Sequence, residues 1–158
     1  MALGLTSRTH VGFVTRTGYY GTVLAYEDLD DLRPDGTVFV DFAGNGELVG
    51  RVHRHLGDAL RYSCRVGVTH WERMASPEAL PGPEPVFFFA PDQARRRMRD
   101  WGGDGFQSRV GEAMRRFLGS TTGWLRVVEG RGHDAVEAVY RATLEGRANP
   151  AEGHVLSL

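Results

Sequence analysis

The sequence contains no lysine, and all 19 of its basic residues are arginine. No lysine amine is therefore present for Schiff-base chemistry or for an ammonium clamp on a phosphate group. GC-rich codon usage explains this bias without any functional role. The formal net charge is −1, so the chain has no basic field that would attract nucleic acid or an anionic membrane surface.

Cysteine is also scarce. Cys64 is the single cysteine, so an intrachain disulfide is excluded and a reducing compartment fits. No apolar run is long enough to span a bilayer, and residues 1–6 lack the pattern of a signal peptide. We therefore expect a cytoplasmic protein. No cysteine, histidine and carboxylate cluster has zinc spacing, so we predict no metal site.

What the sequence does contain is typical of one globular domain. It has 158 residues, of which 41% are hydrophobic and 25% are charged. Strand-like runs alternate with helical patterns, which predicts an α/β fold with a mainly parallel sheet. The predicted strands cover residues 2–6, 22–26, 37–42, 60–68, 86–89, 124–128 and 154–158. Residues 71–86 are rich in proline and form the irregular loop that we expect to lie beside a substrate.

The run Thr37–Phe42 is apolar on both faces, which predicts a parallel strand that is buried on both sides. The segment that follows contains Ala43, Gly44 and Asn45 and opens a helix that Asn45 can cap. A phosphate or cofactor can meet bare backbone N–H groups at such a point. The glycine spacing is not G-x-G-x-x-G, however, and a plain strand-to-helix turn is the alternative.

Thr6, Ser7 and Arg8 lie at the carboxyl end of the first predicted strand, where open α/β sheets bind ligands. Hydroxyl groups with an arginine can accept the 2′-phosphate of NADP, whereas an acidic residue selects NAD. No acidic residue is near in the sequence. The alternative is an ordinary capping serine beside a solvated arginine.

Gly67, Val68, Thr69 and His70 end the fourth predicted strand and bring a hydroxyl group and an imidazole together. His70 is the candidate general acid, or a hydrogen-bond partner for a cofactor amide. The alternative for His70 is a structural role inside the fold.

Several strings together resemble one family. They are Gly4–Ser7, Gly18–Tyr26, Val40–Asn45, Val66–Trp71, Pro81–Pro83, Phe87–Gln93, Asp100–Gly102 and Gly153–Leu158. Their order and spacing resemble the uncharacterised family DUF2855 over essentially the whole chain. That family is similar to the cofactor-binding half of zinc-independent medium-chain dehydrogenase/reductases. The resemblance implies an incomplete Rossmann-like three-layer domain.

The resemblance also implies roles for single residues. Thr6, Ser7 and Arg8 would hold the adenosine 2′-phosphate of NADP(H), with Tyr26 on the adenosine side. Ala43, Gly44 and Asn45 would line the cofactor. The nicotinamide would lie near the segment Gly67–His70, where His70 is the candidate catalytic residue. Phe87 to Phe89, among them the predicted site residues Phe88 and Phe89, would flank it from a short later strand.

The resemblance begins at what would be the second Rossmann strand. The glycine-rich phosphate turn of the first strand is then missing, and we expect NADP(H) binding by this chain alone to be weak or lost. The missing strand would leave two unpaired edges in mid-sheet, which a homodimer or a partner chain would have to cover. Three functions stay open: part of a reductase that transfers hydride to an activated carbonyl or alkene, a subunit of a split reductase, and a non-catalytic remnant or interaction subunit.

Overall fold

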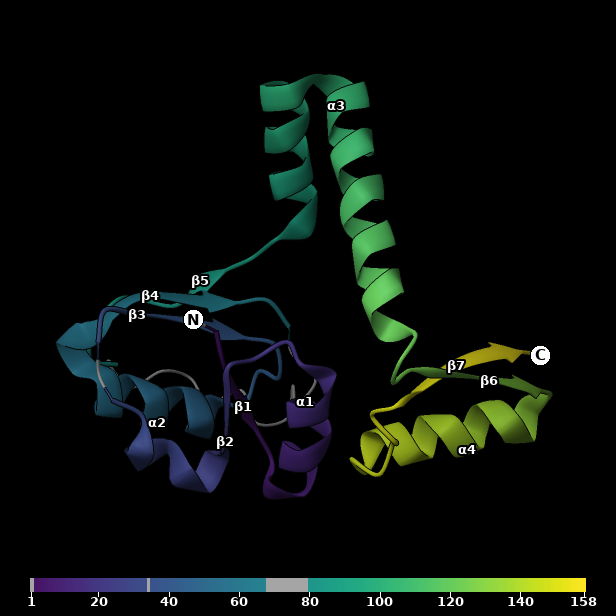
Figure 1. Cartoon of the computed structure of the whole chain (residues 1–158), viewed down its shortest axis with the longest axis horizontal. Helices are drawn as coiled ribbons and strands as arrows, with labels where there is room; N and C mark the ends of the chain where they lie inside the picture. The colour runs from purple at the N-terminus through teal and green to yellow at the C-terminus, as the bar shows by residue number, and fades with distance from the viewer. Residues whose placement is uncertain (1, 34, 68–79) are drawn as a thin grey trace. The chain divides into compact units, whose positions relative to one another are not determined.

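The computed structural model describes residues 2–33, 35–67 and 80–158, in two compact units, Met1–Phe106 and Gln107–Leu158 (Figure 1). Both units contain parallel strands joined by helices, which confirms the predicted α/β class. Among the described residues the strands form three small sheets instead of one. That residues 1–158 form a single domain stays a prediction.

The first sheet of the unit Met1–Phe106 pairs β1 (Leu3–Thr6) with β2 (Thr22–Ala25) in parallel. The short 3-10 helix η1 (Arg8–His10) and helix α1 (Val11–Thr17) connect them. α1 ends at Gly18, whose φ of 73° lies in the left-handed region that glycine adopts without steric cost. The elements predicted for residues 2–26 are therefore confirmed.

The second sheet of this unit has the order β3-β4-β5, with all strands parallel. Its strands are β3 (Thr37–Asp41), β4 (Leu60–Arg65) and β5 (Val86–Phe87). The 3-10 helix η2 (Tyr26–Asp31) precedes β3, and helix α2 (Gly46–Leu56) with η3 (Gly57–Ala59) leads from β3 to β4. As predicted, the Asn45 side chain caps α2.

The core of the unit lies around α2. Leu48, Val52 and Leu56 follow helical spacing, so they lie on one face of α2 and pack as one apolar stripe. They form a buried cluster with Leu29 of η2 and Leu60 of β4. Partly buried residues of both sheets and of the segment between them pack against this cluster: Leu5 of β1, Phe39 of β3, Tyr26 of η2, and Leu32. Helix α2 therefore joins the two sheets into one unit.

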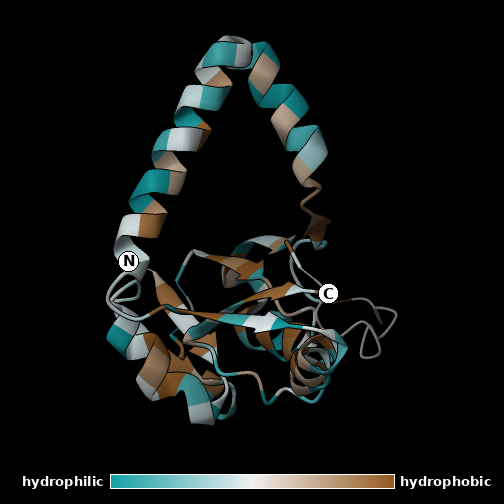
Figure 2. Cartoon of the chain, turned by 90° about the vertical axis from the view of Figure 1, so that its right-hand side faces the viewer, coloured by the Kyte–Doolittle hydropathy of each residue, from teal (hydrophilic) through white to brown (hydrophobic). Residues whose placement is uncertain are grey.

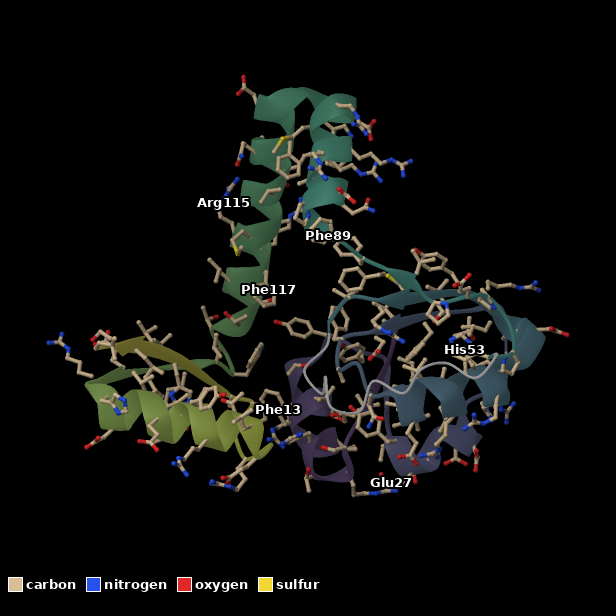
Figure 3. The ribbon with its side chains drawn as sticks, turned by 180° about the vertical axis from the view of Figure 1, so that it is seen from behind. Phe13, Glu27, His53, Phe89, Arg115 and Phe117 are labelled. Atoms are coloured by element: carbon tan, nitrogen blue, oxygen red, sulfur yellow. The ribbon has the colours of Figure 1, made fainter. Side chains whose placement is uncertain are left out.

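A fully buried histidine ties α2 to β4 and to the end of the proline-rich segment (Figure 3). The His53 Nδ1 atom lies 2.9 Å from the carbonyl oxygen of Pro81, which can only accept, so Nδ1 carries the proton. The Nε2 atom lies 2.9 Å from the Ser63 hydroxyl, which donates to it. Every polar atom of the ring is thereby paired, and His53 is a structural residue.

The face of the second sheet that points away from α2 is uncovered by the described residues. Val38, Val40, Tyr62 and Val86 alternate onto this face and are 58%, 44%, 44% and 48% exposed. The expectation that the strand at 37–42 is buried on both sides is therefore wrong for the described part of the chain. The alternation of side chains along a strand determines which residues share a face of the sheet. It does not show whether a second layer covers that face.

Helix α3 (Ala90–Thr121) is interrupted at Gly102, where φ is 73° and ψ is 164°. It therefore consists of two helical segments, as the glycine pair Gly102-Gly103 in the sequence indicates. Along its length hydrophilic and hydrophobic residues alternate, whereas hydrophobic residues gather in the strands (Figure 2).

In the unit Gln107–Leu158, β6 (Arg126–Arg131) pairs in parallel with β7 (Glu152–Ser157), and helix α4 (His133–Leu144) connects them. The N-cap of α4 is Gly132, with a φ of 84°, and no side chain caps it. Glu137 instead accepts hydrogen bonds from Arg141, one turn later. Gly130 packs closely against Leu156 and Ala135, so a side chain at this position would clash.

Replacing Ser63 by alanine should lower the free energy of unfolding by about 1–3 kcal/mol, because the buried His53 Nε2 atom loses its donor. Thr22→Ala is the control, since it removes an exposed hydroxyl from the same unit and should cost less than about 0.5 kcal/mol. Urea unfolding followed by circular dichroism measures both values. Equal losses in the two variants would contradict the structural role of the His53 hydrogen bonds.

Candidate functional site

Most of the predicted site residues lie at the carboxyl ends of the strands in the unit Met1–Phe106. We call the following residues the carboxyl edge: Thr6–Arg8, Tyr26–Asp28, Asp41–Asn45, Arg65–Gly67 and Phe87–Phe89. In each sheet the strands are parallel, so their carboxyl ends lie side by side. This edge is where open α/β sheets bind ligands.

Tyr26 shows that the two sheets present their carboxyl ends together. This half-buried tyrosine directly follows β2. Burial raises the pKa of Tyr26, and the negative charges of Asp41 and then Glu27 raise it further. Asp41 is the last residue of β3 and belongs to the other sheet. Its effect on Tyr26 places the ends of β2 and β3 within electrostatic reach of each other.

The turn between β3 and α2 uses its backbone N–H groups internally. The Oδ1 atom of Asp41 accepts hydrogen bonds from the N–H groups of Ala43 and Gly44, each at 3.0 Å. The Oδ1 atom of Asn45 accepts from the N–H groups of Glu47 and Leu48, at 3.1 and 3.3 Å. The expectation of bare N–H groups for a phosphate is therefore wrong at these four positions, and the contacts fit a plain strand-to-helix turn.

The second carboxylate oxygen of Asp41 has no such partner. Asp41 is only 6% exposed, and its buried Oδ2 atom makes no hydrogen bond with the described residues. Asp41 directly precedes Phe42 and the helix start, so this oxygen belongs to the carboxyl edge. The sequence reasoning missed Asp41, although it is the one charged residue within an apolar strand.

The backbone around Asp41 is closely packed. Its carbonyl oxygen accepts from the N–H groups of Val66 at 2.7 Å and Gly67 at 3.4 Å. A Cβ atom on Gly67 would lie 2.3 Å from the carbonyl oxygen of Phe42, so only glycine fits there. The ends of β3 and β4 are therefore held at a fixed distance, and the Asp41 carboxylate is held with them.

The end of β1 places Arg8 between two acidic side chains. The Nη2 atom of Arg8 lies 2.5 Å from Oδ1 of Asp28, and its Nε atom lies 3.8 Å from Oε2 of Glu27. The hydrogen bond and charge of Asp28 raise the pKa of this arginine. The Ser7 hydroxyl bonds the hydroxyl of Thr9 and Nδ1 of His10. No acidic residue is near Arg8 in the sequence, but the fold brings Glu27 and Asp28 to it.

Three aromatic residues lie at the end of β5, the strand that pairs with β4. Phe87, Phe88 and Phe89 are 59%, 39% and 49% exposed. Figure 3 labels Phe89. β5 ends at Phe87, and the N–H group of Phe88 donates to the carbonyl oxygen of Arg65 at 2.8 Å. This bond fixes Phe88 beside the carboxyl end of β4. Val68, Thr69 and His70 lie outside the described residues, so the catalytic role of His70 stays a prediction.

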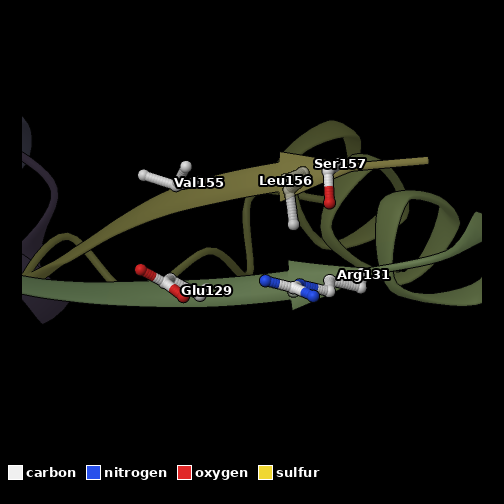
Figure 4. Close-up of a pocket in the computed structure, with 6 residues that line it drawn as sticks. Glu129, Arg131, Val155, Leu156 and Ser157 are labelled. Carbon is white, nitrogen blue, oxygen red and sulfur yellow. The ribbon is translucent and has the colours of Figure 1, made fainter.

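A shallow depression lies on β6 and β7 of the other unit (Figure 4). Glu129 and Arg131 of β6 stand beside Val155 and Ser157 of β7, in register. None of these residues was predicted as a site residue. Among the described residues there is no group of three histidine, cysteine or acidic side chains that could hold a metal ion. No described helix is long and apolar enough to cross a membrane.

Replacing Asp41 by asparagine should lower the pKa of Tyr26, because a negative charge near the phenol is removed while the larger effect of burial remains. The raised pKa means that this group's contribution to stability is complete below its unfolded pKa of about 10 and is lost as the pH rises through the folded value. Titration of the Tyr26 Cζ signal by NMR measures the change. Asp58→Asn, at the opposite end of β4, is the control. An unchanged Tyr26 pKa in the Asp41 variant would contradict the convergence of the two sheets.

Comparison with known proteins places the chain in a family without assigning it an activity. No curated protein and no solved structure shows significant similarity to the sequence. One family model, described as "Protein of unknown function (DUF2855)", matches residues 1–149. This match covers nearly all of the chain, including every residue of the carboxyl edge. The chain therefore belongs to the DUF2855 family.

Proposed function

We propose that the carboxyl edge binds NADP(H) and that the chain is the cofactor-binding part of a zinc-independent medium-chain reductase-like protein. The observation that carries this proposal is that Tyr26, which follows β2, and Phe39 of β3 pack against the same buried cluster, which brings the two sheets together near their carboxyl ends. Parallel strands from two sheets thereby offer one continuous ligand-binding edge. In the complete protein, the cofactor supplies a hydride to an activated carbonyl or alkene.

The adenosine end of the cofactor fits the side of the edge formed by β1 and β2. Ser7 and Arg8 follow β1 and offer a hydroxyl group and a guanidinium to the 2′-phosphate. Tyr26, whose ring is half-buried, follows the neighbouring strand β2. The phosphate has to compete with Asp28 and Glu27 for Arg8. This competition supports weak binding by the chain alone.

The nicotinamide end fits the side formed by β4 and β5. At the end of β4, Gly67 packs against the carbonyl oxygen of Phe42, and the exposed rings of Phe88 and Phe89 offer apolar surface to a flat heterocycle. These residues bind and orient the ring and exclude water from it. His70 is proposed as the polar group beside the nicotinamide.

Replacing Asp28 by asparagine should strengthen NADPH binding by about two- to fivefold, because Arg8 is released from an exposed ion pair. NADH lacks the 2′-phosphate, so its affinity should change less. Asp35→Asn, an exposed acid elsewhere in the unit, is the control. Fluorescence titration of the wild-type chain and the two variants with NADPH and with NADH measures the six affinities.

Two results would count against the proposal. No binding of NADPH at millimolar concentration by the folded chain overturns cofactor binding. Binding with an unchanged ratio of NADPH to NADH affinity in the Asp28 variant overturns the role of Arg8 alone.

An interaction subunit without catalytic activity is the second candidate, and the uncovered sheet face favours it. Val38, Val40, Tyr62 and Val86 form an apolar surface on neighbouring strands. In the described part of the chain, β1 pairs only with β2 and β3 pairs only with β4, so each has one unpaired edge. We propose that a second copy or a partner chain covers these features. Analytical ultracentrifugation of the chain should then show association that increases with concentration and that Val40→Asp weakens. A monomer at all concentrations contradicts the homodimer.

A further inference from the structure

The unpartnered oxygen of Asp41 is the feature of the carboxyl edge that ordinary folding does not explain. Burying a carboxylate oxygen without a hydrogen bond is energetically costly, because the oxygen loses its hydrogen bonds to water. Most buried polar atoms in proteins are therefore paired. Oδ1 of Asp41 already fixes the turn by accepting from Ala43 and Gly44. Oδ2 adds nothing to that turn, and among the described residues it bonds nothing.

The chemistry of the surrounding groups limits what Oδ2 can bind. A carboxylate can only accept a hydrogen bond, so its partner must be a donor. A phosphate is excluded, because it is negatively charged and because Asp41 and Asn45 already occupy four of the N–H groups of the turn. Arg65 is the register partner of Asp41 on the neighbouring strand, which disfavours a cation. An uncharged donor remains.

We propose that the Oδ2 atom of Asp41 accepts a hydrogen bond from a ribose hydroxyl of the ligand that binds the carboxyl edge. This inference rests on the proposed function, because it specifies which part of a nucleotide the edge recognises. Carboxylates at strand ends of open α/β sheets hold ribose hydroxyls for the same reason: a charged acceptor binds a neutral donor strongly.

The geometry prepares Asp41 for this contact before any ligand arrives. The two N–H groups on Oδ1 fix the plane of the carboxylate, and the backbone bonds from Val66 and Gly67 fix its strand end. The Asp41 carboxylate keeps its position on binding, whereas the atoms that cover its buried Oδ2 atom have to move aside for a hydroxyl to reach it. The ligand also satisfies an oxygen that is already removed from water.

The first test compares NADPH binding to the wild-type chain, Asp41→Asn and Asp58→Asn by calorimetry. Asparagine keeps one oxygen for Ala43 and Gly44 but replaces the free acceptor by a donor. Asp41→Asn should weaken binding by about tenfold or more, as expected for a hydrogen bond to a charged group. Asp58→Asn removes the same charge at the opposite end of β4 and should leave the affinity unchanged. Equal binding by Asp41→Asn and wild type overturns the inference and leaves the proposed function intact.

The second test needs no variant. The carboxyl carbon signal of Asp41 is followed by NMR on the wild-type chain while adenosine or nicotinamide riboside is added at millimolar concentration. At least one should shift the signal, and its 2′,3′-dideoxy counterpart should not. If NADPH does not bind but a ribonucleoside shifts the signal, the proposed function fails and the inference stands. If neither the ribonucleosides nor NADPH shifts it, or if the dideoxy compound shifts it equally, the inference is overturned.

Discussion

Helix α2 holds the unit Met1–Phe106 together, and the carboxyl edge depends on this packing. Its buried stripe of Leu48, Val52 and Leu56 contacts Leu29, which follows β2, and Leu60, which begins β4. In the part of the chain that the structure describes, no strand of one sheet pairs with a strand of the other, and packing on α2 joins the two sheets. Burial of each such leucine contributes about 1.5–3 kcal/mol. Without α2, Tyr26 and Asp41 would have no reason to lie near each other.

The hydrogen bonds around the start of α2 decide what kind of group the edge can recognise. A strand-to-helix turn with free N–H groups attracts anions. Here the side chains of Asp41 and Asn45 satisfy those groups, and Asp41 adds a negative charge. The middle of the edge is consequently suited to neutral donors. Arg8, a cation placed for a phosphate, lies at the end of β1 and is shared with Asp28.

Much of the fold was predictable from local sequence, and most of the site was not. Helical spacing and the cap at Asn45 predicted α2, and Gly18 and Gly57 marked helix ends, because these signals act over a few residues. The pairing of Arg8 with Asp28 depends on two segments twenty residues apart, so no local pattern shows it. The exposure of the sheet face at Val38 and Val40 was not predicted, because an apolar strand has the same sequence pattern whether or not a second layer covers it. Asp41 stands out in the sequence as a single charged residue in an apolar run. Only the structure shows that this carboxylate is buried at the end of a strand.

The central claim is that the carboxyl edge of the unit Met1–Phe106 is the ligand-binding surface of the chain. Its most direct test is the map of backbone amide shifts in ¹⁵N-labelled protein as NADPH is added. The account predicts that the shifted amides cluster at the ends of β1 to β5, from Ser7 through Ala43 and Gly67 to Phe88. Shifts that cluster on β6 and β7, around Glu129 and Ser157, or no shifts at all, would contradict it.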